Sequence, residues 1–151
     1  MIIIKAGAEH LDELAPLFDA YRIFYQQHSN VKAGKYFLEE RITKNESEIF
    51  IAIDDDKRII GFVQLYPVFS STRLKKYWLL NDLFVDAASR GKGIAVALIQ
   101  AVKDLCINSG SCGMMLETAK TNIEGNKLYP KTGFILDENH NYYFWDLPTN
   151  D

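Results

Sequence analysis

The amino-acid sequence predicts an α/β fold in which helices flank one mixed central β-sheet. The main observation is that β-branched and aromatic runs of strand type alternate along the chain with segments whose apolar residues recur every three or four positions. The composition, 48% hydrophobic and 25% charged with 9 Gly and 4 Pro in 151 residues, is typical of a globular chain. This length suits one hydrophobic core, so we expect a single domain over residues 1–151.

The first part of the chain should supply two helices and four strands. Pro16 lies inside the first helical pattern, and we expect a break or kink there because proline cannot donate a backbone hydrogen bond. Asp54 to Lys57 is polar and predicts a hairpin turn between two neighbouring strands. In chain order, we expect a strand at 2–5, helices at 11–24 and about 35–44, and strands at 49–53, 59–68 and 77–85.

The second part should contain two more helices and three more strands. A polar turn with two glycines, residues 86–93, separates the strand at 77–85 from a helix that begins at Ile94 and ends near Asn108. A strand at 114–119, a helix at about 123–131 and closing strands at 134–136 and 142–146 follow. The expected order is therefore β-α-α-β-β-β-α-β-α-β-β.

Charge and hydropathy exclude several classes of function. Lys and Arg number 17 against 20 Asp and Glu, with no block of like charge, so we expect no nucleic-acid partner. The apolar run at residues 1–4 is too short for a signal peptide and no apolar stretch reaches about 18 residues, so we expect a cytoplasmic protein without a membrane partner. Cys106 and Cys112 lack the spacing of a zinc site, and we expect no metal.

The turn Arg90-Gly91-Lys92-Gly93 before the helix is a candidate anion site. A helix start exposes several backbone N–H groups and the positive end of the helix dipole, which together bind phosphate groups. Val96 stands where the third glycine of a dinucleotide fingerprint would be, and no phosphate-binding loop of the Gly-x-x-x-x-Gly-Lys type occurs. The alternative is a tight strand-to-helix connection that needs small residues for packing.

A second motif follows the next predicted strand: Asn122, the pair Leu128-Tyr129, and Gly133-Phe134. Together with Arg90, Gly93 and Ala95, this motif resembles the acyl-CoA-binding signature of the GNAT family of N-acetyltransferases. The predicted order of strands and helices is also similar to the fold of that family, from Ile2 to about Leu147.

The resemblance implies an acetyl-CoA cosubstrate. Backbone N–H groups of the turn and the first helical residues would hold its pyrophosphate, and the end of the preceding strand would pair with its pantetheine arm, one N–H polarising the thioester carbonyl. Two asparagines would reach it from the opposite side. The implied cofactor-binding residues are Leu83, Phe84, Val85, Arg90, Gly91, Lys92, Gly93, Ile94, Ala95, Val96, Asn122 and Asn126.

Tyr129 is the candidate general acid for transfer of the acetyl group to an amine. A phenol with an ordinary pKa of about 10 can protonate a leaving thiolate whose ordinary pKa is about 8.5 once the two are close and desolvated. The alternative is a core tyrosine on the helix face of Leu128. No residue is well placed to carry the acetyl group, so we expect direct attack in a ternary complex.

The general base is less well defined by the sequence. Asn81-Asp82-Leu83-Phe84-Val85 resembles a segment of diamine acetyltransferases in which a Glu-Asp pair precedes the cofactor-binding strand end, but Asn81 stands at the Glu position. Because Asn81 cannot accept a proton, the role falls to Asp82, to Glu117 or to ordered water. For both carboxylates the alternative is an ordinary residue of the sheet.

Candidate acceptor-binding residues are Tyr21, Tyr25 and Asn81, because aromatic rings beside an acidic group can receive an organic cation. The alternative is that the tyrosines belong to a core stripe. We expect the acceptor of the acetyl group to be a primary amine of a small molecule. A diamine or polyamine is the first candidate, and an aminoglycoside or peptide amine is the next. The missing carboxylate at Asn81 leaves a non-catalytic acyl-CoA sensor as an alternative, and an anion-binding module without CoA specificity as another.

The aromatic run Tyr142 to Trp145 predicts a terminal strand that needs a partner. It completes the sheet of its own subunit or packs across a two-fold axis, as in many members of the GNAT family. We therefore expect a homodimer.

Overall fold

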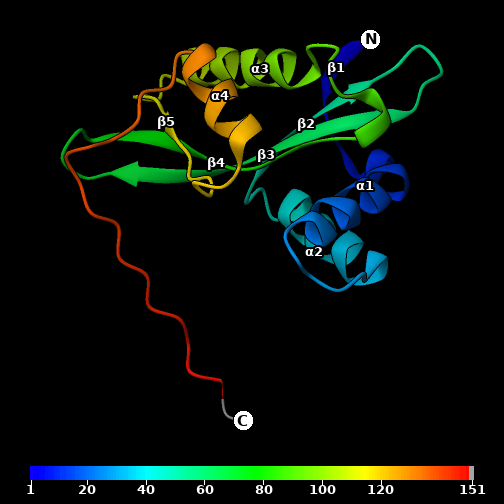
Figure 1. The fold of residues 1–151 in the computed structure, drawn as a ribbon, viewed down its shortest axis with the longest axis horizontal. Helices are drawn as coiled ribbons and strands as arrows, with labels where there is room; N and C mark the ends of the chain where they lie inside the picture. Colours follow the sequence, from blue (N-terminus) through cyan, green and yellow to red (C-terminus); the bar gives the residue numbers. More distant parts are fainter. Residues whose placement is uncertain (150–151) are drawn as a thin grey trace. The chain divides into compact units, whose positions relative to one another are not determined.

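Five strands form one mixed sheet in the order β1-β2-β3-β4-β5 (Figure 1). Neighbouring strands are antiparallel except β4 and β5, which are parallel. The strands are β1 (Ile2–Lys5), β2 (Glu48–Ile53), β3 (Ile59–Ser70), β4 (Lys75–Val85) and β5 (Met114–Met115).

The computed structural model describes residues 1–149, which include four α-helices and two short 3-10 helices. Strands and helices thus form the α/β fold with a mixed sheet that the sequence predicts. No helix within the described range is long and apolar enough to cross a lipid bilayer. The helices are α1 (Leu11–Phe24), α2 (Val31–Thr43), α3 (Ile94–Asn108) and α4 (Ile123–Lys131), with the 3-10 turns η1 (Ala8–His10) and η2 (Ala87–Ser89).

The chain forms two compact units, Met1–Glu117 and the residues from Thr118 onward. The first unit contains the whole sheet with α1, α2 and α3, and the second contains α4 and the C-terminal segment. The count of one domain over residues 1–151 stays a prediction.

Strand β3 lies at the centre of the first unit, and its residues from Gly61 to Leu65 are all buried. On one face Phe62 packs edge-on against Phe18 and Tyr21 of α1, with ring centroids 5.9 and 5.7 Å apart. On the other face α3 comes very close to Gly61: a Cβ placed there would lie 3.1 Å from a methyl carbon of Ile94. The absence of a side chain at Gly61 therefore lets α3 lie directly on the strand.

Helix α2 begins earlier than the sequence pattern indicated, at Val31 rather than near Lys35. Its N-cap is Asn30, whose side-chain oxygen accepts a hydrogen bond from the backbone N–H of Ala33 at 3.0 Å. Buried Asp19 of α1 fixes the loop that precedes α2, because its carboxylate accepts hydrogen bonds from Ser29 Oγ at 2.6 Å and Asn30 N at 2.7 Å. These bonds lower the pKa of Asp19, the Ser29 hydroxyl contributing most.

The expected break at Pro16 is absent, because α1 runs through this residue as one helix. Proline removes the bond that its own N–H would donate to the preceding turn, and its ring crowds the carbonyl four residues earlier. Its neighbours Ala15, Leu17 and Phe18 are all buried in the core, and this packing holds the helix together across the missing bond.

The closing strands expected at 134–136 and 142–146 do not form, and the strand expected at 114–119 is confined to Met114–Met115. Aromatic and β-branched composition favours a strand, but a strand also needs an edge to pair with. Within residues 1–149 no other strand pairs with either closing segment. Residues 134–149 therefore have neither helix nor strand structure.

Substituting Gly61→Ala should destabilise the first unit by about 1–3 kcal/mol, because the new Cβ would also lie 3.2 Å from the Phe84 carbonyl oxygen and 3.3 Å from a methyl carbon of Leu98. The midpoint of urea unfolding measures this change. An unchanged or higher midpoint would show that α3 can move off the strand without cost, contrary to the close packing described here.

Candidate functional site

The turn between β4 and α3 presents an open helix N-terminus. Gly91 and Gly93 have φ values of +78° and +77°, in the left-handed region that favours glycine. Gly93 is the N-cap of α3, no side chain caps the helix, and its first turn holds no acidic residue. A Cβ at either glycine would meet no atom within 4 Å, so space is open around the turn. The geometry fits the pyrophosphate of a nucleotide-type cosubstrate.

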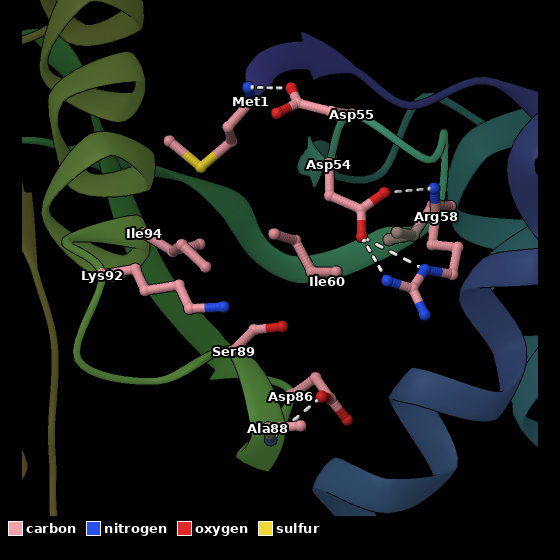
Figure 2. A pocket seen from close by; sticks show the side chains of 11 residues that line it. Met1, Asp54, Asp55, Arg58, Ile60, Asp86, Ala88, Ser89, Lys92 and Ile94 are labelled. Atoms are coloured by element: carbon pink, nitrogen blue, oxygen red, sulfur yellow. Dashed lines mark hydrogen bonds and ion pairs between the residues drawn. The ribbon is translucent and has the colours of Figure 1, made fainter.

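Lys92 of this turn points into a pocket of about 560 Å³ on the hairpin side of the turn (Figure 2). Two of the pocket's three acidic side chains have cationic partners: Asp54 accepts two hydrogen bonds from the Arg58 guanidinium, at 3.0 and 3.2 Å, and Asp55 pairs with the N-terminal amine at 2.8 Å. The third, Asp86, accepts a hydrogen bond from the backbone N–H of Ala88 at 3.1 Å. Lys92 therefore adds positive charge beside the turn. Neither Asp82 nor any residue of α1 lines this pocket.

Arg90 ties the turn to the end of β4. Its Nε donates a hydrogen bond to the carbonyl oxygen of Val85 at 3.1 Å, and its guanidinium lies over the rings of Phe84 and Phe24, 5.4 and 6.0 Å from their centroids. Phe24 is at the C-terminal end of α1. The side chain of Arg90 thus contacts both β4 and α1 from the turn that precedes α3.

The end of β4 has an unpaired backbone edge. Residues Leu83, Phe84 and Val85 pair with β3 on one side. On the other side β5 pairs only with Trp78 and Leu79, and the ladder ends there. Among the strands of the described chain, none occupies the β5 side of residues 80–85, so their backbone groups on that side could pair with an extended ligand.

Asp82 of β4, opposite Gln64 of β3, is buried, with 4% of its surface exposed. Its carboxylate accepts hydrogen bonds from Gln64 Nε2 at 2.7 Å and Asn81 Nδ2 at 3.0 Å, and a further one from the side chain of Tyr21. Burial raises the pKa of Asp82, and these three donors oppose the increase. All three donors are neutral, and no cationic side chain within residues 1–149 forms an ion pair with Asp82.

Tyrosine rings surround this carboxylate. The ring of Tyr21 meets that of Tyr25 edge-on at 5.0 Å. Burial and the charge of Asp82 both raise the pKa of Tyr25, and the same two causes, burial first, raise the pKa of Tyr66 to about 12. Tyr25 is 45% exposed, so this tyrosine is reached from solvent. The arrangement has the chemistry of a receptor for an organic cation.

Asn81 stands beside Asp82 because β4 has a bulge at this point. Gln64 pairs with Asp82 while the next residue, Leu65, pairs with Leu80, so Asn81 is the extra residue. The structure thus brings together four of the predicted site residues, Asp82, Asn81, Tyr21 and Tyr25. It does not bring Glu117 into this cluster: Glu117 is exposed and lies two residues beyond the end of β5.

The remaining predicted residues belong to the second unit. Asn122 caps α4, its Oδ1 accepting from Gly125 N at 3.1 Å, and its Nδ2 donates to Thr118 Oγ1 at 2.9 Å. Asn126 Nδ2 donates to the carbonyl oxygens of Ala119 and Asn122, at 2.9 and 2.7 Å. Both side-chain amides therefore stabilise the N-terminal end of α4. Their contact with a cosubstrate stays a prediction. Tyr129 is half-buried in α4 with its ring edge-on to Phe134 at 5.7 Å.

Two residues of the site were missed by the sequence reasoning. Gln64 is fully buried, and Ser47 Oγ donates to its Oε1 at 2.9 Å, which directs its amide N–H toward Asp82. A signal existed, since Gln64 is the polar residue in the apolar run Ile59 to Leu65. Phe24, which receives Arg90, looked like any other residue of the helical stripe.

Comparisons with known proteins agree with this geometry. Residues 12–134 match the model of the acetyltransferase (GNAT) family. The chain is 37% identical over 148 residues to a Bacillus subtilis (strain 168) protein named uncharacterized N-acetyltransferase YhfO, covering 98% of this chain and 99% of that one. It is 39% identical over 136 residues to a protein of Haemophilus influenzae (strain ATCC 51907 / DSM 11121 / KW20 / Rd) named probable acetyltransferase, covering 87% and 93%.

Among solved structures, the crystal structure of a probable acetyltransferase superposes with a TM-score of 0.94 at 38% identity, covering 99% of this chain and 100% of that chain. The open helix N-terminus, the unpaired end of β4 and the family match over most of the sequence lead to one conclusion. The chain belongs to the acetyltransferase (GNAT) family.

Proposed function

We propose that this acetyltransferase transfers the acetyl group of acetyl-CoA to a primary amine of a small molecule, by direct attack in a ternary complex. Diamine- or polyamine-like amines are the first candidates, and aminoglycoside or peptide amines come next. The observation that carries the proposal is Asp82, a buried carboxylate with neutral donors and tyrosine rings around it and no cationic partner in the described chain.

On this proposal, the first unit holds the cosubstrate by its backbone. The N–H groups from Gly91 to Val96 bind the pyrophosphate at the start of α3, and Lys92 adds a positive charge. The unpaired edge of Leu83, Phe84 and Val85 pairs with the pantetheine arm, and one of these N–H groups polarises the thioester carbonyl. Acetyl-CoA supplies the activated acetyl group when bound.

The acceptor binds as an ammonium between the tyrosine rings and Asp82. Burying a carboxylate without a counter-charge is costly, and an incoming ammonium would offset that cost. Asp82 then accepts a proton from the ammonium, and the neutral amine attacks the thioester carbonyl. Gln64, held by Ser47, keeps the carboxylate oriented throughout. As the tetrahedral intermediate collapses and the C–S bond breaks, Tyr129 of the second unit protonates the departing thiolate, and the second proton lost by the acylated nitrogen passes through solvent to restore the Tyr129 phenol.

Release of free thiol from acetyl-CoA, followed colorimetrically with a pooled panel of diamines, polyamines, aminoglycosides and amino acids, tests the proposed function. We expect release above the background without amine, strongest in the diamine and polyamine fraction once the pool is split. No release with any amine, while acetyl-CoA still raises the Tm, would contradict the proposal and favour a non-catalytic acyl-CoA sensor.

Tyr129→Phe should lower kcat roughly 100-fold or more, because the thiolate would leave without a proton donor. Acetyl-CoA affinity should change little, since the aromatic ring remains. Steady-state kinetics and a binding isotherm separate the two effects, and Tyr36→Phe, on the exposed face of α2, is the matched control. If the kcat of Tyr129→Phe equals that of wild type between about pH 7 and pH 9, Tyr129 has no role in the mechanism.

Asp82 should set the acid limb of the pH–rate profile. Only the carboxylate accepts a proton, so kcat/KM falls as the pH drops through the pKa of Asp82, and because burial raises this pKa the loss begins above the ordinary Asp range of about 4. Asp82→Asn should abolish this limb and lower kcat/KM roughly 100-fold.

The same measurement on Glu117→Gln decides between the two candidate bases. A normal acid limb in Asp82→Asn that disappears in Glu117→Gln would identify Glu117 as the base. A normal limb in both variants would favour proton transfer through ordered water.

We also propose that the active form is a homodimer with no nucleic-acid or membrane partner. The exposed rings of Tyr143, Phe144 and Trp145 support the dimer, because clustered exposed apolar side chains are typical of protein–protein contacts.

A further inference from the structure

The side-chain hydroxyls of Tyr25 and Tyr66 form no hydrogen bond with any other group of residues 1–149. Tyr21 differs from them, because its side chain already donates to the Asp82 carboxylate. Tyr25 is partly exposed and Tyr66 is half-buried. A half-buried hydroxyl without a protein partner is a group that a ligand can satisfy.

Tyr66 lies on the same face of the sheet as Asp82. Successive side chains of a strand alternate between the two faces, so residues 62, 64 and 66 of β3 point to one of them. This is the face that α1 covers, because Phe62 packs against Tyr21 and Gln64 donates to Asp82. Tyr66 is therefore the next side chain beyond Gln64 on the acceptor side of the sheet.

Both hydroxyls are within reach of the charge of Asp82. Burial first and this charge second raise the pKa of Tyr25, and they raise the pKa of Tyr66 to about 12. Both phenols therefore stay neutral near pH values of about 7 to 8, and each keeps an oxygen that can accept a hydrogen bond. The charge of Arg41 also reaches Tyr66, but Arg41 is already paired with two carboxylates, Glu46 at 2.6 Å and Glu40 at 3.5 Å.

The Asp82 carboxylate keeps room for one more hydrogen bond. An ionised carboxylate can accept about four. Gln64, Asn81 and Tyr21 each donate one. One carboxylate lone pair and two tyrosine hydroxyl oxygens are thus acceptors that no group of the described chain uses.

We propose that Asp82, Tyr25 and Tyr66 together hold a primary ammonium by its three N–H groups, and that Tyr66 selects against amines methylated on nitrogen. The proposal rests on the amine acetylation proposed above, and it names the residue that selects among amines. A methyl group in place of one N–H leaves a hydroxyl desolvated and unpaired, which weakens binding. Tyr66 selects more strongly than Tyr25, because water can satisfy the partly exposed hydroxyl of Tyr25.

Calorimetric titration of the full-length protein without acetyl-CoA tests this selection. The probes are the diamine putrescine and N,N′-dimethylputrescine, in which both nitrogens are secondary. We expect wild type to bind the dimethyl compound roughly 10-fold or more weakly than putrescine.

Tyr66→Phe removes only the hydroxyl and should weaken putrescine binding roughly 10-fold. The Kd of the dimethyl compound should change less than about 3-fold, because that compound does not use the hydroxyl, so the ratio of the two Kd values falls towards one. Tyr36→Phe, on the exposed face of α2, is the matched control and should keep the wild-type ratio.

Equal Kd values in wild type, or no binding of either diamine, would overturn the proposal whatever the variants do. A Tyr66→Phe variant that binds both diamines more weakly by the same factor would also overturn it, because that result indicates a structural role. Thiol release from acetyl-CoA with putrescine tests the proposed function separately. Release together with equal Kd values would overturn the selection by Tyr66 alone, whereas selective binding without release would support that selection and contradict acetyl transfer to putrescine.

Discussion

The site depends on one constraint, the complete burial of β3 from Gly61 to Leu65. Successive side chains of a strand point to opposite faces of the sheet, so these residues face α3 and α1 alternately. Gly61 lets α3 approach, which fixes the open helix start, and Phe62 anchors α1, which fixes the tyrosines. Gln64 reaches Asp82 on the neighbouring strand. Both halves of the candidate site are thus positioned by one stretch of backbone.

Electrostatically, the two halves are opposites. The cosubstrate side is built from backbone N–H groups and a helix dipole, which attract an anion without needing a buried charge. The acceptor side is built around a carboxylate whose partners are all neutral donors. Arg90 lies between them, on the carbonyl of Val85 and the rings of Phe84 and Phe24. Its guanidinium contacts these groups and forms no ion pair with Asp82, so the acceptor side of the described chain has no fixed cation.

The sequence was sufficient where local signals decide the outcome. Helix α4 matches its predicted limits at Ile123 and Lys131, and the Gly91–Gly93 turn lies where its spacing indicated. The sequence was insufficient where contacts between distant residues determine the structure. The core packing that carries α1 past Pro16 and the hydrogen bond from Gln64 to Asp82 depend on residues distant in the chain. Residues 142–146 have the composition of a strand, but a strand forms only where another strand offers an edge for pairing, and no sequence pattern supplies that edge.

The order of the strands has a consequence for how the chain acquires its structure. Strands β2, β3 and β4 follow one another as two antiparallel hairpins, so their contacts join residues that are near in sequence and close with little loss of chain entropy. Strand β5 is parallel to β4 and can be added only after α3 has crossed the sheet. The hairpins that carry Gln64 and Asp82 can therefore pair before α3, the helix that completes the anion turn, packs onto the sheet.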